Sequence, residues 1–318
     1  MAKVFFLGKI AVTGGAGFIG SHLVQELVEK GHKVRVIDNL SFGKKANLTE
    51  FLDEIEFIEA DIRNFEKLKD SFKNTDCVFH LAALRSVFPS FDNPREYADV
   101  NISGTLNVLK AAIEQNVKKV IFASSSSVYG MSEKFPQKET DVADPKSPYA
   151  LTKYVGEYYM KHFFEQHGLE TVSLRYFNVF GPKQGSDSNY AAVIPKFIKA
   201  VLQDEKPIIF GTGEQSRDFT FVKDVVLANI SAMNAGKKAG GKVFNICNGK
   251  SVSINRLLGL VNKNLGKNIL PVFAPSRESE AMKTEGSTKL AKEFLGFECK
   301  YSFEKGLEEL INWSQINF

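Results

Sequence analysis

The first half of the chain alternates short apolar runs with longer segments in which apolar residues recur three or four positions apart. The short runs are rich in β-branched residues and predict buried strands, whereas the longer segments predict amphipathic helices, for example at residues 18–30 and 103–115. The predicted strands are residues 9–13, 33–37, 56–59, 77–81, 119–124 and 170–175. This alternation predicts an α/β fold, a Rossmann-type doubly wound parallel sheet with helices on both faces.

The pattern changes after Asn178, where loops lengthen and Gly, Pro, Ser and Asn become frequent. We therefore expect a smaller mixed α/β C-terminal lobe beside the sheet. The predicted division is a sheet domain of residues 1–177 and 217–247, and a second lobe of residues 178–216 and 248–318.

Four further elements are predicted in the second half of the chain. A strand followed by a helix is expected within residues 219–233, with Asp224 as the N-cap of that helix. Two short helices are expected near the end. Ser287 is the predicted cap of the first and Gly296 its end, and the second covers residues 303–313.

Composition and charge exclude several classes of protein. Hydrophobic residues make up 43% of 318 residues, and 41 Lys+Arg against 37 Asp+Glu give a formal net charge of +4, as in ordinary globular proteins. No apolar run is long enough to span a membrane.

The basic residues are dispersed, so no nucleic-acid partner is expected. Three cysteines without a CxxC motif, and histidines without HExxH, argue against a disulfide framework and a metal site and fit a cytoplasmic location.

Three glycines follow the first predicted strand and open the first predicted helix. Gly14, Gly17 and Gly20 lie in the run TGGAGFIG, where missing side chains let the backbone approach a pyrophosphate and the helix N-terminus offers free N–H groups. Asp38 follows the second strand, where a carboxylate accepts hydrogen bonds from ribose hydroxyls and repels a 2′-phosphate. The pattern predicts NAD rather than NADP as cofactor. The alternative interpretation is a tight turn followed by a surface aspartate.

A tyrosine and a lysine lie one turn apart at the start of another predicted helix. Ser147 and Pro148 are typical of a helix N-terminus, and they put Tyr149 and Lys153 on the same face. A free phenol has a pKa of about 10, too high for a base at neutral pH, and a neighbouring ammonium lowers that value. We expect Lys153 and a cationic nicotinamide together to make Tyr149 a base. The alternative is a surface Tyr–Lys pair.

Four serines at residues 124–127 follow a predicted central strand. They are either a flexible linker or part of the carboxyl edge of the sheet, where ligands bind in folds of this type. In the second case, one hydroxyl shares the substrate proton with Tyr149.

Together these residues resemble the extended short-chain dehydrogenase/reductase family, over nearly the whole chain. Within it, the sequence is similar to the NAD-dependent nucleotide-sugar 4-epimerases, and most similar to the UDP-N-acetylglucosamine 4-epimerase group. The matching motifs are TGGAGFIG at 13–20, DIRN at 61–64, HLAA at 80–83, SSSSVYG at 124–130, YALTK at 149–153, RYFNVFG at 175–181 and SRDFTFV at 216–222.

The resemblance implies a UDP-sugar substrate and a homodimer formed through helices near residues 103–115 and 149–165. It also implies that Tyr149 is the base, Lys153 its electrostatic helper and ribose anchor, and Ser125 the hydroxyl partner. The implied NAD-binding residues are Gly14, Gly17, Phe18, Ile19, Gly20, Asp38, Asn39, Asp61, Ile62, Leu81, Ala82, Ala83, Arg85, Asn101, Tyr149, Lys153 and Tyr176. The implied substrate-binding residues are Ser86, Ser126, Ser127, Asn178, Val193, Lys196, Ile208, Phe210, Arg217, Arg277, Glu280 and Thr284.

The identity of the sugar depends on Thr284, which falls where the family has a gatekeeper residue. A large aromatic residue there restricts the pocket to plain hexoses, whereas a small residue leaves room for an N-acetyl group. The resemblance therefore favours interconversion of UDP-GlcNAc and UDP-GalNAc, with UDP-Glc and UDP-Gal as further substrates, through a transient 4-keto sugar and enzyme-bound NADH.

Other reactions of related enzymes are the alternatives. Dehydratases have an Asp-Glu pair directly after the active hydroxyl, where this chain has Ser126 and Ser127, so elimination lacks its acid–base catalysts. A plain UDP-glucose 4-epimerase, a nucleotide-sugar reductase or dehydratase, and a non-catalytic nucleotide- or RNA-binding relative are the remaining interpretations.

Overall fold

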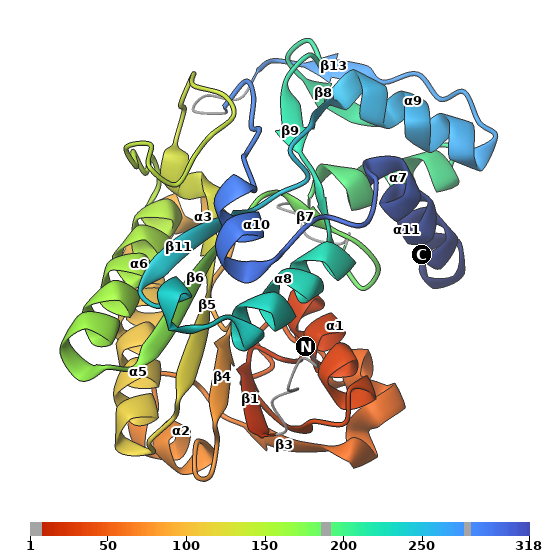
Figure 1. Cartoon of the computed structure of the whole chain (residues 1–318). Helices are drawn as coiled ribbons and strands as arrows, with labels where there is room; N and C mark the ends of the chain where they lie inside the picture. The colour runs from red at the N-terminus through yellow and green to blue at the C-terminus, as the bar shows by residue number, and fades with distance from the viewer. Residues whose placement is uncertain (1–7, 186–191, 277–280) are drawn as a thin grey trace.

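The computed structural model describes residues 8–185, 192–276 and 281–318 (Figure 1). Its centre is a parallel sheet of seven strands in the order β11-β6-β5-β4-β1-β2-β3. The bounds are β1 Lys9–Thr13, β2 Lys33–Asp38, β3 Ile55–Glu59, β4 Cys77–His80, β5 Lys119–Ser125, β6 Glu170–Tyr176 and β11 Lys242–Ile246. The predicted Rossmann-type fold is therefore confirmed, and each predicted strand is present to within one or two residues.

Helices cover both faces of the sheet because alternate strand residues point to opposite sides. Ile10 and Val12 of β1 join the core under α1 and α8, whereas Ala11 joins the core on the other face. The first face carries α1 Phe18–Glu29, α8 Val222–Asn234 and α10 Lys289–Leu295. The second carries α2 Phe65–Ser71, α5 Gly104–Glu114 and α6 Pro148–His167, on the left in Figure 1.

A second core lies beyond the carboxyl edge of the sheet. It is formed by apolar residues of α7 Val193–Leu202, α9 Ile254–Leu265 and α11 Phe303–Asn317, at the upper right of Figure 1. Three two-stranded sheets surround it: β7 Val179–Phe180 with β10 Thr220–Phe221, β8 Ile208–Phe210 with β13 Val272–Ala274, and β9 Ser216–Asp218 with β12 Ser251–Ser253. The exact division of the chain into two domains stays a prediction, and α10 packs against β11 of the large sheet.

Short helical segments complete the described chain. They are α3 Phe88–Asp92, α4 Pro94–Ala98, a π-helical turn at Asp99–Ser103, and 3-10 segments at Lys45–Glu54, Ser126–Tyr129 and Lys237–Ala239. Within the described residues, no helix combines the length and apolar character needed to cross a bilayer.

The predicted N-caps Asp224 and Ser287 were wrong, whereas the predicted end of α10 at Gly296 was right. Helix α8 begins directly after β10, with Phe221 at the N-cap, and Asp224 lies inside its first turn. The Asp224 carboxylate accepts hydrogen bonds from the backbone N–H groups of Lys300 and Tyr301, so it ties down a distant segment. Thr288 takes the N-cap position of α10 in place of Ser287. Gly296 ends that helix in the left-handed conformation, as predicted (φ 64°).

Two helices of the second lobe were not predicted. Helix α9 carries sequence signals that identify it, because Ser253 caps its N-terminus, Gly266 ends it, and Leu257, Leu258 and Val261 recur at helical spacing. Helix α7 has an apolar face but no capping side chain. Gly and Asn are frequent on either side of these helices, and this made the helical spacing of their apolar residues difficult to recognise.

A buried ion pair joins α6 to β6. The Arg175 guanidinium makes two hydrogen bonds to the Glu157 carboxylate, at 2.8 and 2.7 Å, and both side chains are at most 5% exposed. The Ser124 hydroxyl donates to the same carboxylate at 2.5 Å. The pair locks the helix that carries Tyr149 and Lys153 against the strand beside β5.

Replacing Glu157 with Gln should lower the free energy of unfolding by about 3–5 kcal/mol, because Arg175 keeps its charge without a buried counter-charge. The measurement is urea denaturation followed by circular dichroism. The control is Glu165→Gln on the same helix, which breaks an exposed pair with Lys161 and should change stability by less than about 1 kcal/mol. Equal losses in the free energy of unfolding would show that the buried Arg175–Glu157 pair contributes no more to stability than the exposed pair.

Candidate functional site

A cavity of ≈ 550 Å³ lies at the carboxyl edge of the sheet, where β1, β2, β4 and β5 end and α6 begins. The chain order reverses here, since β1 lies between β4 and β2, and such a switch point is the usual ligand crevice of an open α/β sheet. Of the predicted cofactor residues, those that line the cavity are Gly14, Gly17, Phe18, Ile19, Gly20, Asp38, Asn39, Asp61, Ile62, Leu81, Ala82, Ala83, Arg85, Tyr149, Lys153 and Tyr176.

The glycine loop forms one wall of the cavity and has no space for side chains. Gly14 has a φ of +71°, and a Cβ there would lie 2.7 Å from the Ala82 nitrogen. A Cβ on Gly20 would lie 2.2 Å from the Gly14 oxygen. Gly17 is the N-cap of α1, so no side chain satisfies the first N–H groups of that helix. The backbone therefore presents free donors and the positive end of a helix dipole, which suit a pyrophosphate.

Asp38 ends β2 at the rim of the same cavity. Its Oδ2 accepts a hydrogen bond from the Ala16 N–H at 3.0 Å and its Oδ1 accepts one from the Leu40 N–H at 2.8 Å. Each oxygen keeps a further acceptor site for a ribose hydroxyl. A Cβ on Gly43 would lie 2.8 Å from both carboxylate oxygens, so this glycine leaves the approach to Asp38 open. Burial raises the pKa of Asp38, and the two backbone N–H groups oppose that shift.

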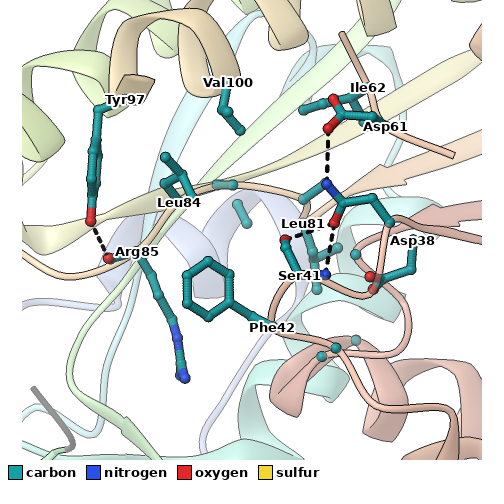
Figure 2. A pocket seen from close by; sticks show the side chains of 18 of the residues that line it. Asp38, Ser41, Phe42, Asp61, Ile62, Leu81, Leu84, Arg85, Tyr97 and Val100 are labelled. Carbon is teal, nitrogen blue, oxygen red and sulfur yellow. Dashed lines mark hydrogen bonds between the residues drawn. The ribbon is translucent and has the colours of Figure 1, made fainter. Parts of the chain in front are cut away.

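A polar cluster around Asp61, which is labelled in Figure 2, lies where the chain leaves β2 and β3. The Asn39 amide donates to Asp61 at 2.9 Å, and the Arg63 guanidinium binds the same carboxylate at 2.9 and 2.7 Å. These bonds, those from Arg63 foremost, lower the pKa of Asp61 to about 2. The Asp61 side chain is thus held in one position, and Asp61 and Ile62 form part of the cavity wall. Arg63, which lines the cavity beside them, was not among the predicted residues.

Asn101, a predicted cofactor residue, lies behind the cavity rather than in its lining. Its side chain is 2% exposed and binds Leu84 twice, accepting from the N–H at 2.8 Å and donating to the carbonyl at 3.0 Å. It also donates to the Thr152 hydroxyl at 3.0 Å. From the π-helical turn, the Asn101 side chain therefore fixes the cavity wall at Leu84 and connects this wall to α6 through Thr152.

Tyr149 lines the cavity and is partly buried, and its phenol lies beside the Ser125 hydroxyl. The helix starts as predicted, with the Ser147 hydroxyl accepting from the Ala150 N–H at 3.1 Å and Pro148 in the first turn. Burial raises the pKa of the Tyr149 phenol, and the bond to Ser125 and the charge of Arg85 act in the opposite direction. The Ser–Tyr contact expected from the sequence is present.

The Lys153 ammonium is held against the end of β5. It donates to the Ala123 carbonyl at 2.8 Å and lies 5.0 Å from the centre of the Phe122 ring. Burial lowers the pKa of Lys153 to about 7, with Glu157 opposing that shift. The expectation that Lys153 and a cationic nicotinamide together lower the Tyr149 pKa stays a prediction. Lys153 still lines the cavity, where a ribose anchor is expected.

The predicted substrate residues are spread over the second lobe and the loops that face it. Ser126 and Ser127 form the 3-10 segment after β5, and the buried Ser127 hydroxyl has no hydrogen-bond partner. The Thr284 hydroxyl accepts from the Asn178 amide and from the Asp218 N–H, both at 3.1 Å. Ser86, Val193, Lys196, Ile208, Phe210 and Arg217 do not line the NAD-sized cavity. Arg277 and Glu280 lie outside the described residues.

Several cavity residues were missed, and apart from Arg63 in the DIRN motif they lie in none of the matching motifs. Ser41, Phe42, Gly43, Arg63, Leu84, Pro89, Asn93, Glu96, Tyr97 and Val100 also line the cavity. Their loops come from between the predicted elements, so only the fold brings them to the site. Within the described residues, no group of three His, Cys, Asp or Glu side chains forms a candidate metal centre.

The residues of this cavity fit NAD. The glycine loop offers space and backbone donors to a pyrophosphate, Asp38 offers acceptors to a ribose, and the Ile62 and Val100 side chains offer apolar surface to a base (Figure 2). Tyr149 and Lys153 lie where a nicotinamide ribose would meet the reacting group.

Comparisons with known proteins agree with this arrangement. A model described as the NAD dependent epimerase/dehydratase family matches residues 10–247. A putative UDP-glucose 4-epimerase from Methanocaldococcus jannaschii is 38% identical over 310 residues, covering 97% of this chain and 99% of that protein.

Two solved structures have the same fold over almost their whole length. The UDP-glucose 4-epimerase of Thermotoga maritima, solved with UDP-glucose, is 40% identical with a TM-score of 0.93, covering 97% of this chain and 99% of that one. The UDP-N-acetylglucosamine 4-epimerase of Methanobrevibacter ruminantium, in complex with UDP-N-acetylmuramic acid, is 41% identical with a TM-score of 0.93, covering 98% and 99%. This chain belongs to the NAD-dependent epimerase/dehydratase family, and its cofactor is NAD.

Proposed function

We propose that this protein is a UDP-sugar 4-epimerase that interconverts UDP-N-acetylglucosamine and UDP-N-acetylgalactosamine and also accepts UDP-glucose and UDP-galactose. One observation carries the proposal: the phenol of Tyr149, beside Ser125, shares a single cavity with the glycine loop. A group that exchanges a proton thus lies beside the NAD site. Relatives named as 4-epimerases at 38–41% identity support the same reaction.

Tyr149 and Ser125 would carry out the proton chemistry. NAD, when bound, supplies the hydride acceptor for C4 of the sugar and the hydride donor for its opposite face. Tyr149 takes the proton of the 4-hydroxyl, directly or through Ser125, and returns it after the flat 4-keto sugar has turned over. Lys153 anchors the nicotinamide ribose. The cavity holds the reacting atoms close together, which removes much of the entropic barrier.

The residues after Ser125 favour epimerisation over elimination. A dehydratase needs an acid and a base near C5 and C6, and here Ser126 and Ser127 occupy the first two positions of the 3-10 segment. Their hydroxyls do not supply that acid–base pair at neutral pH. Epimerisation needs only the Tyr149–Ser125 pair and NAD.

The second lobe is proposed to hold UDP. We assign Asn178, Val193, Lys196, Ile208, Phe210 and Arg217 to this role, together with Arg277 and Glu280 outside the described residues. We also propose a cytoplasmic homodimer. Leu151 and Tyr158, which are 50% and 60% exposed on α6, support a partner surface on that helix.

The N-acetyl preference depends on Thr284. The names of similar structures divide between UDP-glucose and UDP-N-acetylglucosamine at equal TM-scores, so they do not separate the two sugars. Both lone pairs of the Thr284 hydroxyl accept hydrogen bonds, from Asn178 and from the Asp218 backbone. Its hydrogen therefore remains for a ligand acceptor such as an acetyl carbonyl. A small side chain here also leaves space for the acetyl group.

Replacing Tyr149 with Phe should reduce turnover of UDP-GlcNAc by about 10²–10⁴-fold, because the phenol hydroxyl is the proposed proton acceptor. NAD binding should persist, since the aromatic ring remains in the cavity wall. Product formation is measured by chromatography and the bound NAD by its release on denaturation.

The control for this substitution is Tyr159→Phe, which removes a hydroxyl from the same helix at a position outside the cavity lining. It should retain wild-type turnover. Near-normal activity of Tyr149→Phe would show that another group accepts the proton.

Replacing Thr284 with Tyr should abolish conversion of UDP-GlcNAc while conversion of UDP-glucose remains detectable, because the larger side chain fills the proposed acetyl space. Thr284→Ser serves as the control, since it keeps the hydroxyl and a small volume. The two kcat/KM values are compared for each variant. An unchanged ratio in Thr284→Tyr would exclude this residue from sugar selection.

A further inference from the structure

Phe42 lines the NAD cavity and yet leaves most of its side chain exposed. It is 60% exposed and belongs to the loop between β2 and the 3-10 segment Lys45–Glu54. Figure 2 shows its ring projecting into the pocket, between Ser41 on one side and the Arg85 side chain on the other. An exposed phenylalanine is common on an outer surface, but one that projects into a ligand cavity offers apolar contact area to the ligand.

The backbone before Phe42 is held against the end of β2. The Asp38 carboxylate accepts a hydrogen bond from the Leu40 N–H at 2.8 Å. The Asn39 side-chain oxygen accepts two more, from the Ser41 N–H at 3.1 Å and from the Ser41 hydroxyl at 2.7 Å. Leu40 has a φ of +59°, which residues other than glycine rarely adopt. These bonds fix the turn from which Phe42 extends.

The backbone after Phe42 is held against the glycine loop. The Lys44 N–H donates to the Ala16 carbonyl at 3.0 Å, and the Asn47 amide donates to the same carbonyl at 2.9 Å. Gly43 lies so close to this loop that a Cβ there would be 2.9 Å from the Ala16 Cβ. Phe42 therefore lies at the tip of a loop that is fixed on both sides, and its ring is the part of the loop that enters the cavity.

This position puts the Phe42 ring beside the adenosine half of the NAD site. Gly43 adjoins both the Asp38 carboxylate, which offers acceptors to a ribose, and Ala16 of the glycine loop, which suits a pyrophosphate. The ring next to it carries no hydrogen-bonding group. Its contribution to a bound cofactor is therefore contact area and the exclusion of water, and water exclusion strengthens the polar contacts beneath it.

We propose that Phe42 is a cofactor-retaining residue, whose ring covers the adenosine half of bound NAD and slows the release of NAD from the protein. The inference rests on the NAD site alone, and it is independent of the sugar and of Tyr149 as the base. In the proposed reaction NAD is regenerated in every cycle, so a residue that keeps NAD bound spares the enzyme from reloading between turnovers.

The test is the rate at which NAD leaves the protein in the absence of any sugar nucleotide. The purified protein is loaded with NAD and freed of excess NAD by gel filtration. Ethanol and an excess of alcohol dehydrogenase then reduce each released NAD to NADH, with oxidation of ethanol to acetaldehyde, and the absorbance of NADH reports the rate of release. Thermal unfolding of each variant, followed by circular dichroism, shows that it is folded.

Phe42→Ala should release NAD about 5–20-fold faster than the wild type, because the variant lacks the apolar area that NAD would cover. Phe42→Leu keeps most of that area and should stay within about threefold of the wild-type rate. The matched control is Phe273→Ala. Phe273 is 57% exposed on β13 and does not line the cavity, so its removal should leave the release rate unchanged.

Phe42→Trp tests the contact between the ring and NAD directly. Trp313 is the only tryptophan of the chain and does not line the cavity, so the wild type supplies the background signal. Bases that lie against an indole quench its fluorescence. The additional fluorescence of Phe42→Trp should therefore rise as NAD leaves, at the same rate as NADH appears in the coupled assay.

Three results would overturn the inference: release from Phe42→Ala at the wild-type rate, an equal acceleration in Phe273→Ala, or fluorescence of Phe42→Trp that stays constant while NAD leaves. Each would leave the proposed function intact, because no sugar takes part in these measurements. Conversely, an active Tyr149→Phe would refute the proposed base without affecting the role of Phe42 in NAD retention.

Discussion

A phenol buried in a protein holds its proton more tightly than one in water, and the chemistry of this site depends on overcoming that constraint. Burial is needed at Tyr149 because a dry site strengthens every interaction with the reacting atoms. The same burial raises the pKa of the group that must lose a proton. The Ser125 hydroxyl and the Arg85 charge oppose this effect. Lys153 is subject to the same desolvation, which lowers its pKa to about 7.

The sheet determines which groups can meet at the site. Parallel strands bring their carboxyl ends to one edge, so the glycine loop after β1, Asp38 at the end of β2 and Ser125 at the end of β5 lie around one cavity. Helix α6 begins at this edge, with Tyr149 in its first turn. The Arg175–Glu157 pair and the Ser124–Glu157 bond hold the helix there, which makes the position of Tyr149 a property of the buried core.

Six strands of the large sheet and the glycine loop could be predicted because their signals are local, whereas β11 was missed. A strand of β-branched residues, three glycines and a terminal aspartate lie within one stretch of chain, as do Ser147, Pro148 and Tyr149. The orientation of the Lys153 side chain could not be predicted, because its hydrogen-bond partner is the backbone carbonyl of Ala123 on strand β5. Tyr97 was missed for the same reason, since its partners lie on the loop after β4 and on α6.

Asn101 and Asp224 show a second limit of sequence patterns. The family resemblance implied a cofactor contact for Asn101, and residue type and position indicated a helix cap for Asp224. In the structure each side chain binds backbone groups of a distant segment, Leu84 in one case and Lys300 in the other. A polar side chain of given type can satisfy either local or long-range backbone groups, and only the packed fold decides between them.

The central claim is that C4 of a UDP-sugar is oxidised and reduced within one enzyme-bound cycle. The most direct measurement is to incubate the protein and NAD with UDP-GlcNAc carrying deuterium at C4, and to identify the product by NMR and mass spectrometry. The account predicts UDP-GalNAc that retains the deuterium at C4, because the same hydrogen leaves and returns. Loss of the deuterium to solvent, or formation of a 4-keto-6-deoxy sugar, would contradict it.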